Sequence, residues 1–373
     1  MDACDILIVG GGPAGSSCAW ALRGSGLDVA ILDRKVFPRD KVCGGWITPA
    51  VLSELEIDPA AYAQNRVLQP ITAFRTGWIG GPALDTDYNE VVSYGIRRRE
   101  FDEYLLRRSG ARLMEGVALQ SLQREKGAWM VNGEIRAALV VGAGGHFCPV
   151  AKLTGAKPAR ENAVVAQEAE FEMDAQQQAA CQVSAHRPEL YFCADLKGYG
   201  WCFRKGNYLN IGLGRMDQHR LPEHVATFLN FLKWSGRICF EISSSLLGHA
   251  YLLYGVSARK LADQAVLLIG DAAGLAYKQS GEGIRPAIES GLLAAQAIRA
   301  ARGDYSRESL GTYQELLARR FGKTGKDWAS RIAEYLPPAW IGALGRCLLG
   351  TRWFARGVVI DRWFLHANQS GNC

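Results

Sequence analysis

The sequence predicts an α/β protein in which a Rossmann-like domain is interleaved with a mostly antiparallel β-sheet domain, followed by C-terminal helices. Three observations support this fold. The first 35 residues read as strand, glycine-rich turn, helix, strand and acid; buried strands that end in glycine recur at 138–145 and 265–270; and apolar and polar residues alternate between 163 and 254. With 373 residues, the chain is long enough for two intertwined domains.

The N-terminal stretch has the order that a dinucleotide-binding βαβ unit requires. An apolar strand at 6–9 leads into Gly10, which permits a tight turn, and Gly12, which leaves room for a pyrophosphate beside the backbone. Gly15 lets the following helix pack closely on the sheet, and its first N–H groups favour phosphate. Asp33 ends the second strand, where a carboxylate can accept hydrogen bonds from a ribose. We therefore expect an ADP-ribose-type ligand rather than an ordinary glycine turn, although this unit alone does not separate FAD from NAD.

The remaining elements follow from apolar periodicity and turn residues. A loop at 34–45 and a small β excursion at 67–92 interrupt the first domain. The predicted domains are 1–65, 94–160 and 256–305 for nucleotide binding, 66–93 and 161–255 for the substrate-binding sheet, and 306–373 for a C-terminal helical segment. We predict helices at 97–108, 222–235, 283–301, 305–321 and 328–366, with breaks at Pro337–Pro338 and Gly350, and strands at 111–123, 129–131, 138–141, 164–171, 208–214 and 266–269.

Composition excludes several classes of protein. The net charge of +6 comes without a long basic run, so no nucleic-acid partner is expected. Asp2 and Asp5 argue against a signal peptide, and no apolar stretch is long enough to cross a bilayer. The ten cysteines form no CxxC pair and read as reduced thiols of a cytoplasmic protein, not as a disulfide framework or a metal site.

A second constellation lies near the other end of the chain. The strand at 266–269 ends in Gly270 and Asp271, and Gly281–Ile284 opens a helix. A carboxylate at a strand end can hold a polyol chain, and bare N–H groups at a helix start can stabilise negative charge on a reduced isoalloxazine. Alone, this pattern is equally consistent with a structural turn. Combined with the N-terminal unit, it favours a flavin over a nicotinamide.

Four motifs, which run from residue 6 to 295, carry a resemblance to a known family. The chain resembles flavoproteins of the p-hydroxybenzoate hydroxylase fold and, among them, the geranylgeranyl reductase family. At Gly274 it lacks the histidine that aromatic hydroxylases of this fold usually carry, which favours the reductase branch. The motifs are Gly10–Gly15 with Asp33; Phe37–Gly45; Gly198–Gly206 with Asn210–Gly214; and Gly270–Gly274 with Ser280–Ile284 and Ser290–Gly291.

The resemblance implies FAD as the cofactor and assigns residues to it. It implies Ala14 and Gly15 at the pyrophosphate, Asp33 at the adenosine ribose, and Asp271 at the ribityl chain. The loop Cys43–Gly45 would pass beside the flavin. The implied cofactor-binding set is Gly10, Gly12, Ala14, Gly15, Asp33, Arg34, Cys43, Gly44, Gly45, Arg98, Ala118 (near the adenine), Gly270, Asp271, Gly283 and Ile284 (both at the pyrimidine edge). The chain departs from the family pattern at Gly144, Cys148 and Arg204, where the family carries Asp, Ser and Pro.

Two residues are candidates for catalysis, each with a structural alternative. The Cys43 thiol could donate a proton or respond to oxidation, or it could be a small residue that fits a tight backbone. Trp201, with Tyr199, could line an apolar substrate pocket, or both could be aromatic residues of a sheet core. His146, after the glycine turn, is expected to be a surface loop residue, with a proton relay as the alternative.

The C-terminal tail is rich in tryptophan and arginine between Arg331 and Arg362. Such a surface suits a peripheral membrane contact through the C-terminal helices. The alternatives are a helical cap that closes the core and a dimer face.

Three functions are compatible with these features. The first is a reductase that transfers hydride from reduced flavin to a C=C bond of a lipophilic, isoprenoid-like substrate. The second is an FAD-dependent monooxygenase that hydroxylates or epoxidises an aromatic or secondary-metabolite substrate, because one scaffold serves both chemistries. The third is a flavin-bearing quinone- or lipid-binding protein without turnover. Since the sequence has one dinucleotide fingerprint, we expect electrons from NAD(P)H in the same cleft or from a reduced carrier protein.

Overall fold

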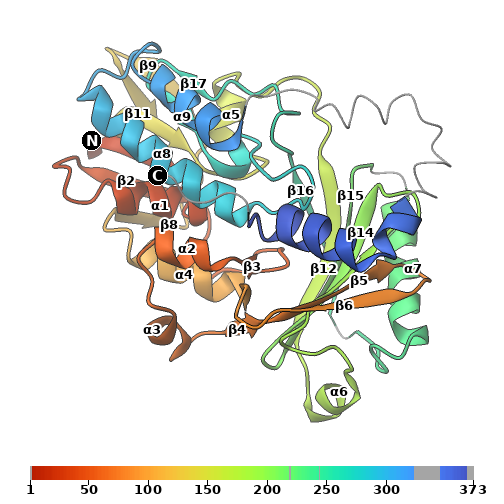
Figure 1. Ribbon diagram of the computed structural model, residues 1–373. Helices are drawn as coiled ribbons and strands as arrows, with labels where there is room; N and C mark the ends of the chain where they lie inside the picture. Colours follow the sequence, from red (N-terminus) through yellow and green to blue (C-terminus); the bar gives the residue numbers. More distant parts are fainter. Residues whose placement is uncertain (1, 218–219, 243, 323–344, 368–373) are drawn as a thin grey trace, which may run out of the picture. The chain divides into compact units, whose positions relative to one another are not determined.

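The computed structural model describes residues 2–217, 220–242, 244–322 and 345–367 (Figure 1). The chain divides into two compact units, each assembled from segments far apart in the sequence. Unit 1 comprises 1–40, 99–162 and 251–325, and unit 2 comprises 41–98, 163–250 and 326–373. No helix in the described part of the chain is long and apolar enough to cross a membrane.

Unit 1 is built on an eight-stranded sheet whose centre is parallel. Its central strands β1, β2 and β11 are rich in valine, isoleucine and leucine and buried on both faces, as strands covered by helices on both sides must be. The main strand order is β17-β18-β11-β1-β2-β8, and β10 and β9 extend the sheet antiparallel from β11. The strands are β1 Asp2–Val9, β2 Val29–Asp33, β8 Arg112–Glu115, β9 Leu122–Glu125, β10 Ala128–Val131, β11 Ile135–Gly142, β17 Ala262–Asp263 and β18 Val266–Leu268.

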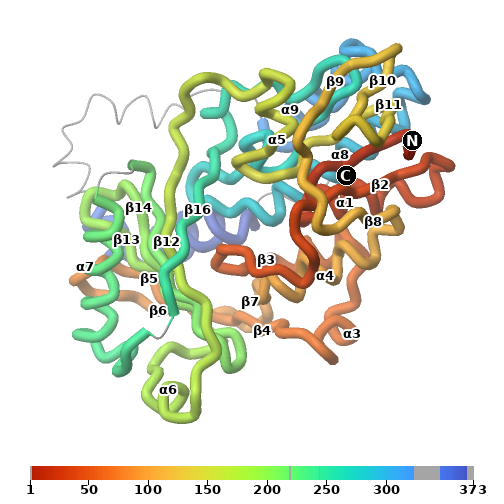
Figure 2. The backbone as a smooth tube through the Cα atoms, turned by 180° about the vertical axis from the view of Figure 1, so that it is seen from behind, coloured from red at the N-terminus to blue at the C-terminus, as the bar shows by residue number. Residues whose placement is uncertain are grey.

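Helices α1 and α8 are far apart in the sequence but pack against each other in unit 1, as Figures 1 and 2 show. Gly291 makes this possible, because a side chain there would overlap the backbone of Ala14. Helix α9 follows, and the Tyr313 hydroxyl donates to the carbonyl of Leu268 at 2.9 Å, which fixes α9 to the end of β18. The helices are α1 Pro13–Ala21, α4 Arg98–Arg107 (whose first residue falls in unit 2), α5 Pro149–Leu153, the 3-10 turn Gly270–Ala272, α8 Ile284–Ala301 and α9 Gly311–Phe321.

Unit 2 is built on a seven-stranded, mostly antiparallel sheet in the order β16-β12-β15-β14-β13-β5-β6. Among the neighbouring strands of this sheet for which the residue register is described, β13 and β5 pair parallel and the others pair antiparallel. A three-stranded sheet, β3-β7-β4, accompanies it. The strands are β3 Trp46–Ile47, β4 Leu68–Ile71, β5 Ala73–Trp78, β6 Ala83–Asp87, β7 Ser93–Ile96, β12 Val164–Glu172, β13 Glu189–Phe192, β14 Gly198–Lys205, β15 Tyr208–Arg215 and β16 Leu247–Tyr251.

The two faces of the large sheet in unit 2 belong to different cores. Along β14, Cys202 belongs to a core that includes α7, whereas Trp201 and Phe203 belong to a second core that includes the π-helix Phe354–Phe364. This alternation is the two-residue period of a strand. The helices of unit 2 are α2 Pro49–Glu54, α3 Pro59–Ala63, α6 Ala175–Ala180, α7 Leu221–Trp234 and this π-helix, and 345–349 is also helical.

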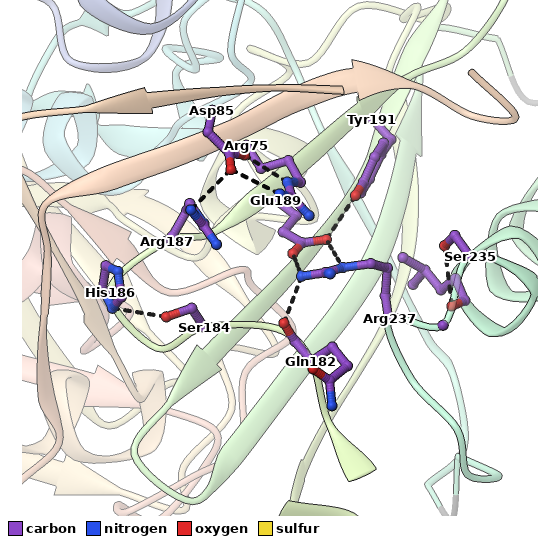
Figure 3. A network of polar contacts seen from close by, with 12 residues as sticks. Arg75, Asp85, Gln182, Ser184, His186, Arg187, Glu189, Tyr191, Ser235 and Arg237 are labelled. Atoms are coloured by element: carbon purple, nitrogen blue, oxygen red, sulfur yellow. Dashed lines mark hydrogen bonds and ion pairs between the residues drawn. The ribbon is translucent and has the colours of Figure 1, made fainter. Parts of the chain in front are cut away.

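A polar network ties β5, β6 and β13 of unit 2 together (Figure 3). Asp85 accepts two hydrogen bonds from Arg75, at 2.7 and 2.8 Å, and one from Arg187 at 3.0 Å. The bond with Arg75 lowers the pKa of Asp85. Fully buried Glu189 pairs with Arg237 and accepts the Tyr191 hydroxyl at 2.8 Å. Because each acid here has a basic partner, we assign this network to the stability of the sheet.

The fold class predicted from the sequence is confirmed, but several elements differ from the prediction. The strand expected at 111–123 is two strands, β8 and β9, and the helix expected from 305 begins at Gly311. The short helices α2, α3, α5 and α6 were not predicted, because five or six residues are too few to show helical periodicity. The tail prediction over 328–344 lies outside the described residues, whereas the break at Gly350 is present as a turn.

The observed units also differ from the predicted domain limits. Residues 41–65 and 94–98 belong to unit 2 rather than to the nucleotide-binding domain, since β3 pairs with β7 and β7 pairs with β4. Residues 306–322 belong to unit 1 rather than to a separate C-terminal segment, since α9 is fixed to β18. The predicted limits differ because they were drawn from the order of the sequence, whereas the observed units depend on strand pairing and helix contacts.

Candidate functional site

The glycine turn after β1 is held by the acid at the end of β2. Gly10 adopts φ +116°, and its N–H donates to the carbonyl of Leu32 at 2.8 Å. One oxygen of Asp33 accepts the N–H of Gly11 at 2.8 Å, and the other accepts the N–H of Lys35 at 2.8 Å. A carboxylate has about four lone-pair positions, so Asp33 keeps acceptor capacity for ribose hydroxyls. Asp33 therefore shapes the turn as well as offering an acceptor.

The glycines of the turn differ in what surrounds them. A side chain on Gly15 would overlap the carbonyl oxygen of Gly10 and press on Ile8 at 3.0 Å, so α1 sits as close to the sheet as the sequence predicts. Around Gly12, by contrast, a methyl group would meet only the Arg39 guanidinium, at 3.4 Å. Space, a helix N-terminus and a fixed positive charge suit a pyrophosphate.

Arg39 is a candidate cofactor contact that sequence reasoning missed. Its guanidinium pairs with the fully buried Asp102 at 3.2 Å and lies over the ring of Phe37, 4.6 Å from its centre. Its only signal in the sequence was its place in the motif Phe37–Gly45. Since α4 supplies Asp102, this helix places a charged group beside the glycine turn.

The Gly270–Asp271 turn lies next to the helix that follows the glycine turn at Gly10–Gly15. Gly270 lies against α1, where a side chain would press on Ala14 at 2.9 Å, and its N–H donates to Ser290 at 2.9 Å. A methyl group on Gly283 would lie 3.1 Å from Asp271. The predicted residues near both ends of the chain thus meet on one side of the parallel sheet. They form a glycine-lined cradle with a carboxylate at the N-terminus of α8, which fits an extended dinucleotide such as FAD.

Buried Arg259 positions the Gly270–Ala272 turn, and no sequence pattern predicted this role. Its guanidinium donates to the carbonyls of Ala272 and His146, both at 2.9 Å, and pairs with Glu161. His146 is 8% exposed, so its expected place in a surface loop is wrong. Burial, followed by the charge of Arg259, lowers the pKa of His146, because a second cation there is unfavourable.

Two predicted contacts lie at the margins of the unit 1 site. Ala118 is exposed, and its carbonyl accepts a hydrogen bond from Asn132 at 2.9 Å. The preceding N–H, of Val117, donates to the Asp33 carbonyl at 2.9 Å, so this loop runs past the end of β2. Arg34 is exposed beside it. Adenine and cofactor contacts of these residues stay predictions.

The loop Cys43–Gly45 belongs to unit 2, as does Arg98, which is buried at the start of α4. Gly45 adopts φ +65°, and its carbonyl accepts the N–H of Ile96 at 2.8 Å. The Lys205 ammonium donates to the carbonyl of Ile96 at 3.0 Å, and a side chain on Gly45 would meet it at 2.6 Å. Cys43 is half-buried. The expectation that this loop passes beside the flavin stays a prediction.

Trp201 is buried and is linked to the loop through Asn210. It is 8% exposed, and its indole N–H donates to Asn210 at 2.7 Å. Asn210 in turn donates to the Cys43 carbonyl at 3.2 Å. Trp201 is therefore a core aromatic residue of β14 that is linked to the loop through one side chain, and its role in lining a substrate pocket stays a prediction.

Glu168, on β12, is a candidate functional residue that sequence reasoning missed. It is 4% exposed, and it accepts the N–H of Cys43. Burial raises the pKa of its carboxyl to about 7, although Lys205, the Cys43 N–H and Lys41 oppose this rise. An acid within an alternating strand gives no sequence signal that separates it from a solvent-facing one.

Comparisons with known proteins support the assignment. The FAD dependent oxidoreductase family matches residues 5–104. A menaquinone reductase of Mycobacterium tuberculosis is 29% identical over 355 residues, with 89% of this chain and 84% of the relative covered. A digeranylgeranylglycerophospholipid reductase of Methanosphaera stadtmanae is 27% identical over 360 residues, covering 89% and 87%. The solved structure of a geranylgeranyl bacteriochlorophyll reductase-like protein from Thermoplasma acidophilum matches with a TM-score of 0.77 at 22% identity, covering 94% and 92%.

The fold, the glycine-lined cradle and these similarities agree with one another. They confirm FAD dependence and the resemblance drawn from the four sequence motifs. The chain is a flavin-dependent oxidoreductase, and it is similar to a menaquinone reductase and to a digeranylgeranylglycerophospholipid reductase.

Proposed function

We propose that this flavoprotein is a reductase that saturates a C=C bond of a lipophilic, isoprenoid-like substrate. Its electrons would come from NAD(P)H or from a reduced carrier protein. When bound, FAD supplies hydride-transfer chemistry. The chain's own residues would bind the substrate, exclude water and deliver a proton.

The observation that carries this proposal is the aromatic surface against the loop Cys43–Gly45. A methyl group on Gly44 would lie 3.6 Å from both Trp201 and Phe203, so the loop has aromatic rings directly beside it. The ring of Trp46 lies 5.9 Å from Phe203 and stacks on Phe364 at 5.1 Å with an interplanar angle of 8°. These rings form a buried apolar layer against the loop, and an apolar layer there favours a hydrocarbon chain over an oxygenated substrate at the loop.

The relatives favour the same chemistry. The two named above are reductases, one of a quinone and the other of a geranylgeranyl lipid. Identity below 30% does not transfer a substrate, but it supports a reductase acting on a molecule with a long apolar part.

The test is an anaerobic single-turnover experiment with the holoenzyme. The flavin is reduced with dithionite, and the return of its oxidised absorbance is followed after addition of menaquinone, a digeranylgeranyl lipid in detergent, or buffer. The proposal predicts reoxidation with at least one isoprenoid. After any quinol has been returned to the quinone in air, the product should still be heavier by about two mass units, the mass of two hydrogens, per saturated C=C bond.

The monooxygenase alternative makes the opposite prediction. It requires rapid oxygen consumption coupled to hydroxylation or epoxidation of an added aromatic compound. It also requires no anaerobic reoxidation by any isoprenoid. That pair of results would overturn the reductase proposal.

A further inference from the structure

Strand β12 of unit 2 carries two acids on one face, and their partners differ. Glu168 and Glu170 are two residues apart, so their side chains point to the same side of the sheet. The Glu170 carboxylate accepts the Lys205 ammonium at 2.5 Å and the Asn210 amide at 3.2 Å, and it lies 3.6 Å from Arg97. Glu170 therefore has basic and amide partners on several sides.

Glu168 has a less polar setting. Its neighbour across the sheet is Gly212, and a side chain on Gly212 would collide with both the Trp201 ring and the Glu168 side chain. The missing side chain lets the indole lie close to Glu168. Since apolar contact on a buried carboxyl disfavours the ion, the setting of Glu168 favours a carboxyl that can hold a proton.

Charged groups face Glu168 from several elements. Lys205 comes from β14, Glu170 from β12 itself and Lys41 from the loop before β3. The Lys41 ammonium lies 3.2 Å from the nearer ring nitrogen of His249, on β16. The two lysines favour the carboxylate, whereas burial and Glu170 favour the acid, so the carboxyl exchanges its proton near neutral pH.

The Glu168 carboxyl also contacts the loop Cys43–Gly45. It accepts the N–H of Cys43, the first residue of the loop that the family resemblance places beside the flavin. Glu168 is the buried acid of β12 that contacts this loop, and the Trp201 ring lies close to it across Gly212.

We propose that Glu168 supplies the proton of the reductase reaction. This inference rests on the proposed function. One carbon of the double bond gains hydride, whose two electrons come from NAD(P)H or a reduced carrier by way of the cofactor. The other carbon gains a proton from the Glu168 carboxyl. The π bond is lost, two C–H bonds form, and Glu168 is left as a carboxylate that takes its next proton from solvent.

The test compares holoenzyme carrying Glu168→Gln with a matched control, Glu172→Gln. The control makes the same change at an exposed position of the same strand. The first readout needs no turnover: in infrared spectra recorded from pH 5 to pH 9, a protonated-carboxyl band should titrate near pH 7 in wild type and in the control, and be absent from Glu168→Gln. The second readout is the anaerobic rate of menaquinone or digeranylgeranyl-lipid reduction against pH.

We expect the wild-type rate to fall about tenfold per pH unit above about pH 7, since the acid form is required. Glu168→Gln should react about 100-fold more slowly and lose this dependence. Glu168→Asp, which restores an acid, should recover part of the rate and a titrating limb, and it serves if the glutamine variant folds poorly. A purely structural role would instead lower the rate equally at every pH.

The outcomes separate the two proposals. If wild type reduces an isoprenoid and Glu168→Gln keeps the wild-type pH profile, Glu168 is not the proton source, while the proposed function stands. If the infrared band persists in Glu168→Gln, the titrating acid is another residue and the inference fails. If FAD-loaded wild type reduces no isoprenoid, the proposed function fails and takes this inference with it.

Discussion

The Asp33 carboxylate accepts the backbone N–H of Gly11 at 2.8 Å, across the turn that joins the first strand to the first helix. This hydrogen bond joins the acid at the end of β2 to the glycine turn at the end of β1. The parallel pairing of β1 and β2 places them side by side. An acid at this position both sets the turn and remains able to accept a ribose hydroxyl.

Asp33→Asn should therefore weaken FAD binding without unfolding the protein. The substitution removes a charge-assisted hydrogen bond, which contributes about 1.5–3 kcal/mol, so the dissociation constant of FAD should rise at least about tenfold. Flavin fluorescence quenching by apoprotein measures it. Asp28→Asn, at an exposed acid just before β2, is the control. Equal affinities in the two variants would remove Asp33 from the cofactor site.

Gly12 and Gly15 should respond differently to the same small change. Gly12→Ala finds open space except for Arg39, so the apoprotein should keep its melting temperature while FAD affinity drops at least about tenfold, because the pyrophosphate loses close approach. Gly15→Ala collides with the Gly10 carbonyl and should cost about 3 kcal/mol of stability. Thermal melts of both apoproteins and FAD titration test this pair. A Gly12→Ala variant with wild-type affinity would contradict the assignment.

Much of unit 1 could be predicted because its signals are local. The strand, the glycine turn, the helix and Asp33 follow one another within 33 residues, and each residue type has one physical reason to be there. The Gly270–Asp271 turn is local in the same way. Arg259 was invisible because its role depends on reaching the carbonyls of Ala272 and His146, which lie 13 and 113 residues away.

The polar cluster of unit 2 could not be read from sequence for a related reason. Glu168 and Glu170 look alike in an alternating strand, and only the paired strands decide that one contacts Lys205 and the other the Cys43 N–H. Likewise, Trp201 is attached to the loop through Asn210, nine residues further along, because β14 and β15 form a hairpin. Sequence identified the loop and the aromatic residues but not the acid between them.

Stability should depend on pH through Glu168. Its folded pKa is raised from 4.5 to about 7, so its contribution to stability is complete below its unfolded value and is lost as pH rises through 7. The loss between pH 4.5 and pH 8.5 should be about 3 kcal/mol. Glu168→Gln should remove this slope, and Glu172→Gln should keep it. Urea denaturation of the holoproteins at several pH values measures both, and parallel curves for wild type and Glu168→Gln would contradict the raised pKa.

Among the described residues of the tail, Trp353 is the main candidate for the predicted membrane contact. Trp353 is 73% exposed just before the π-helix, and Arg352 and Arg356 beside it are exposed as well. Val359, Ile360 and Phe364 of the same segment are buried in unit 2, which supports the helical-cap alternative for that face. The exposed face is thus the candidate for a membrane contact, and the buried face is the one that acts as a helical cap.

Trp353→Ser should lower binding to anionic phospholipid vesicles several-fold, because an interfacial tryptophan and its basic neighbours act together. Trp234→Ser, at a tryptophan that is 83% exposed on α7, is the control. Vesicle co-sedimentation at low and high salt measures both variants. If the two bind alike, the tail is not a membrane contact.

The central claim is that the cradle formed by the glycine turn at Gly10–Gly15 and by the Gly270–Asp271 turn holds FAD. Chromatography of the cofactor released by heating the purified protein tests it most directly. The account predicts a yellow protein that releases FAD in an amount equimolar with the chain, and Gly12→Ala protein that releases much less. Colourless protein that releases no flavin and cannot be reconstituted with FAD would contradict it.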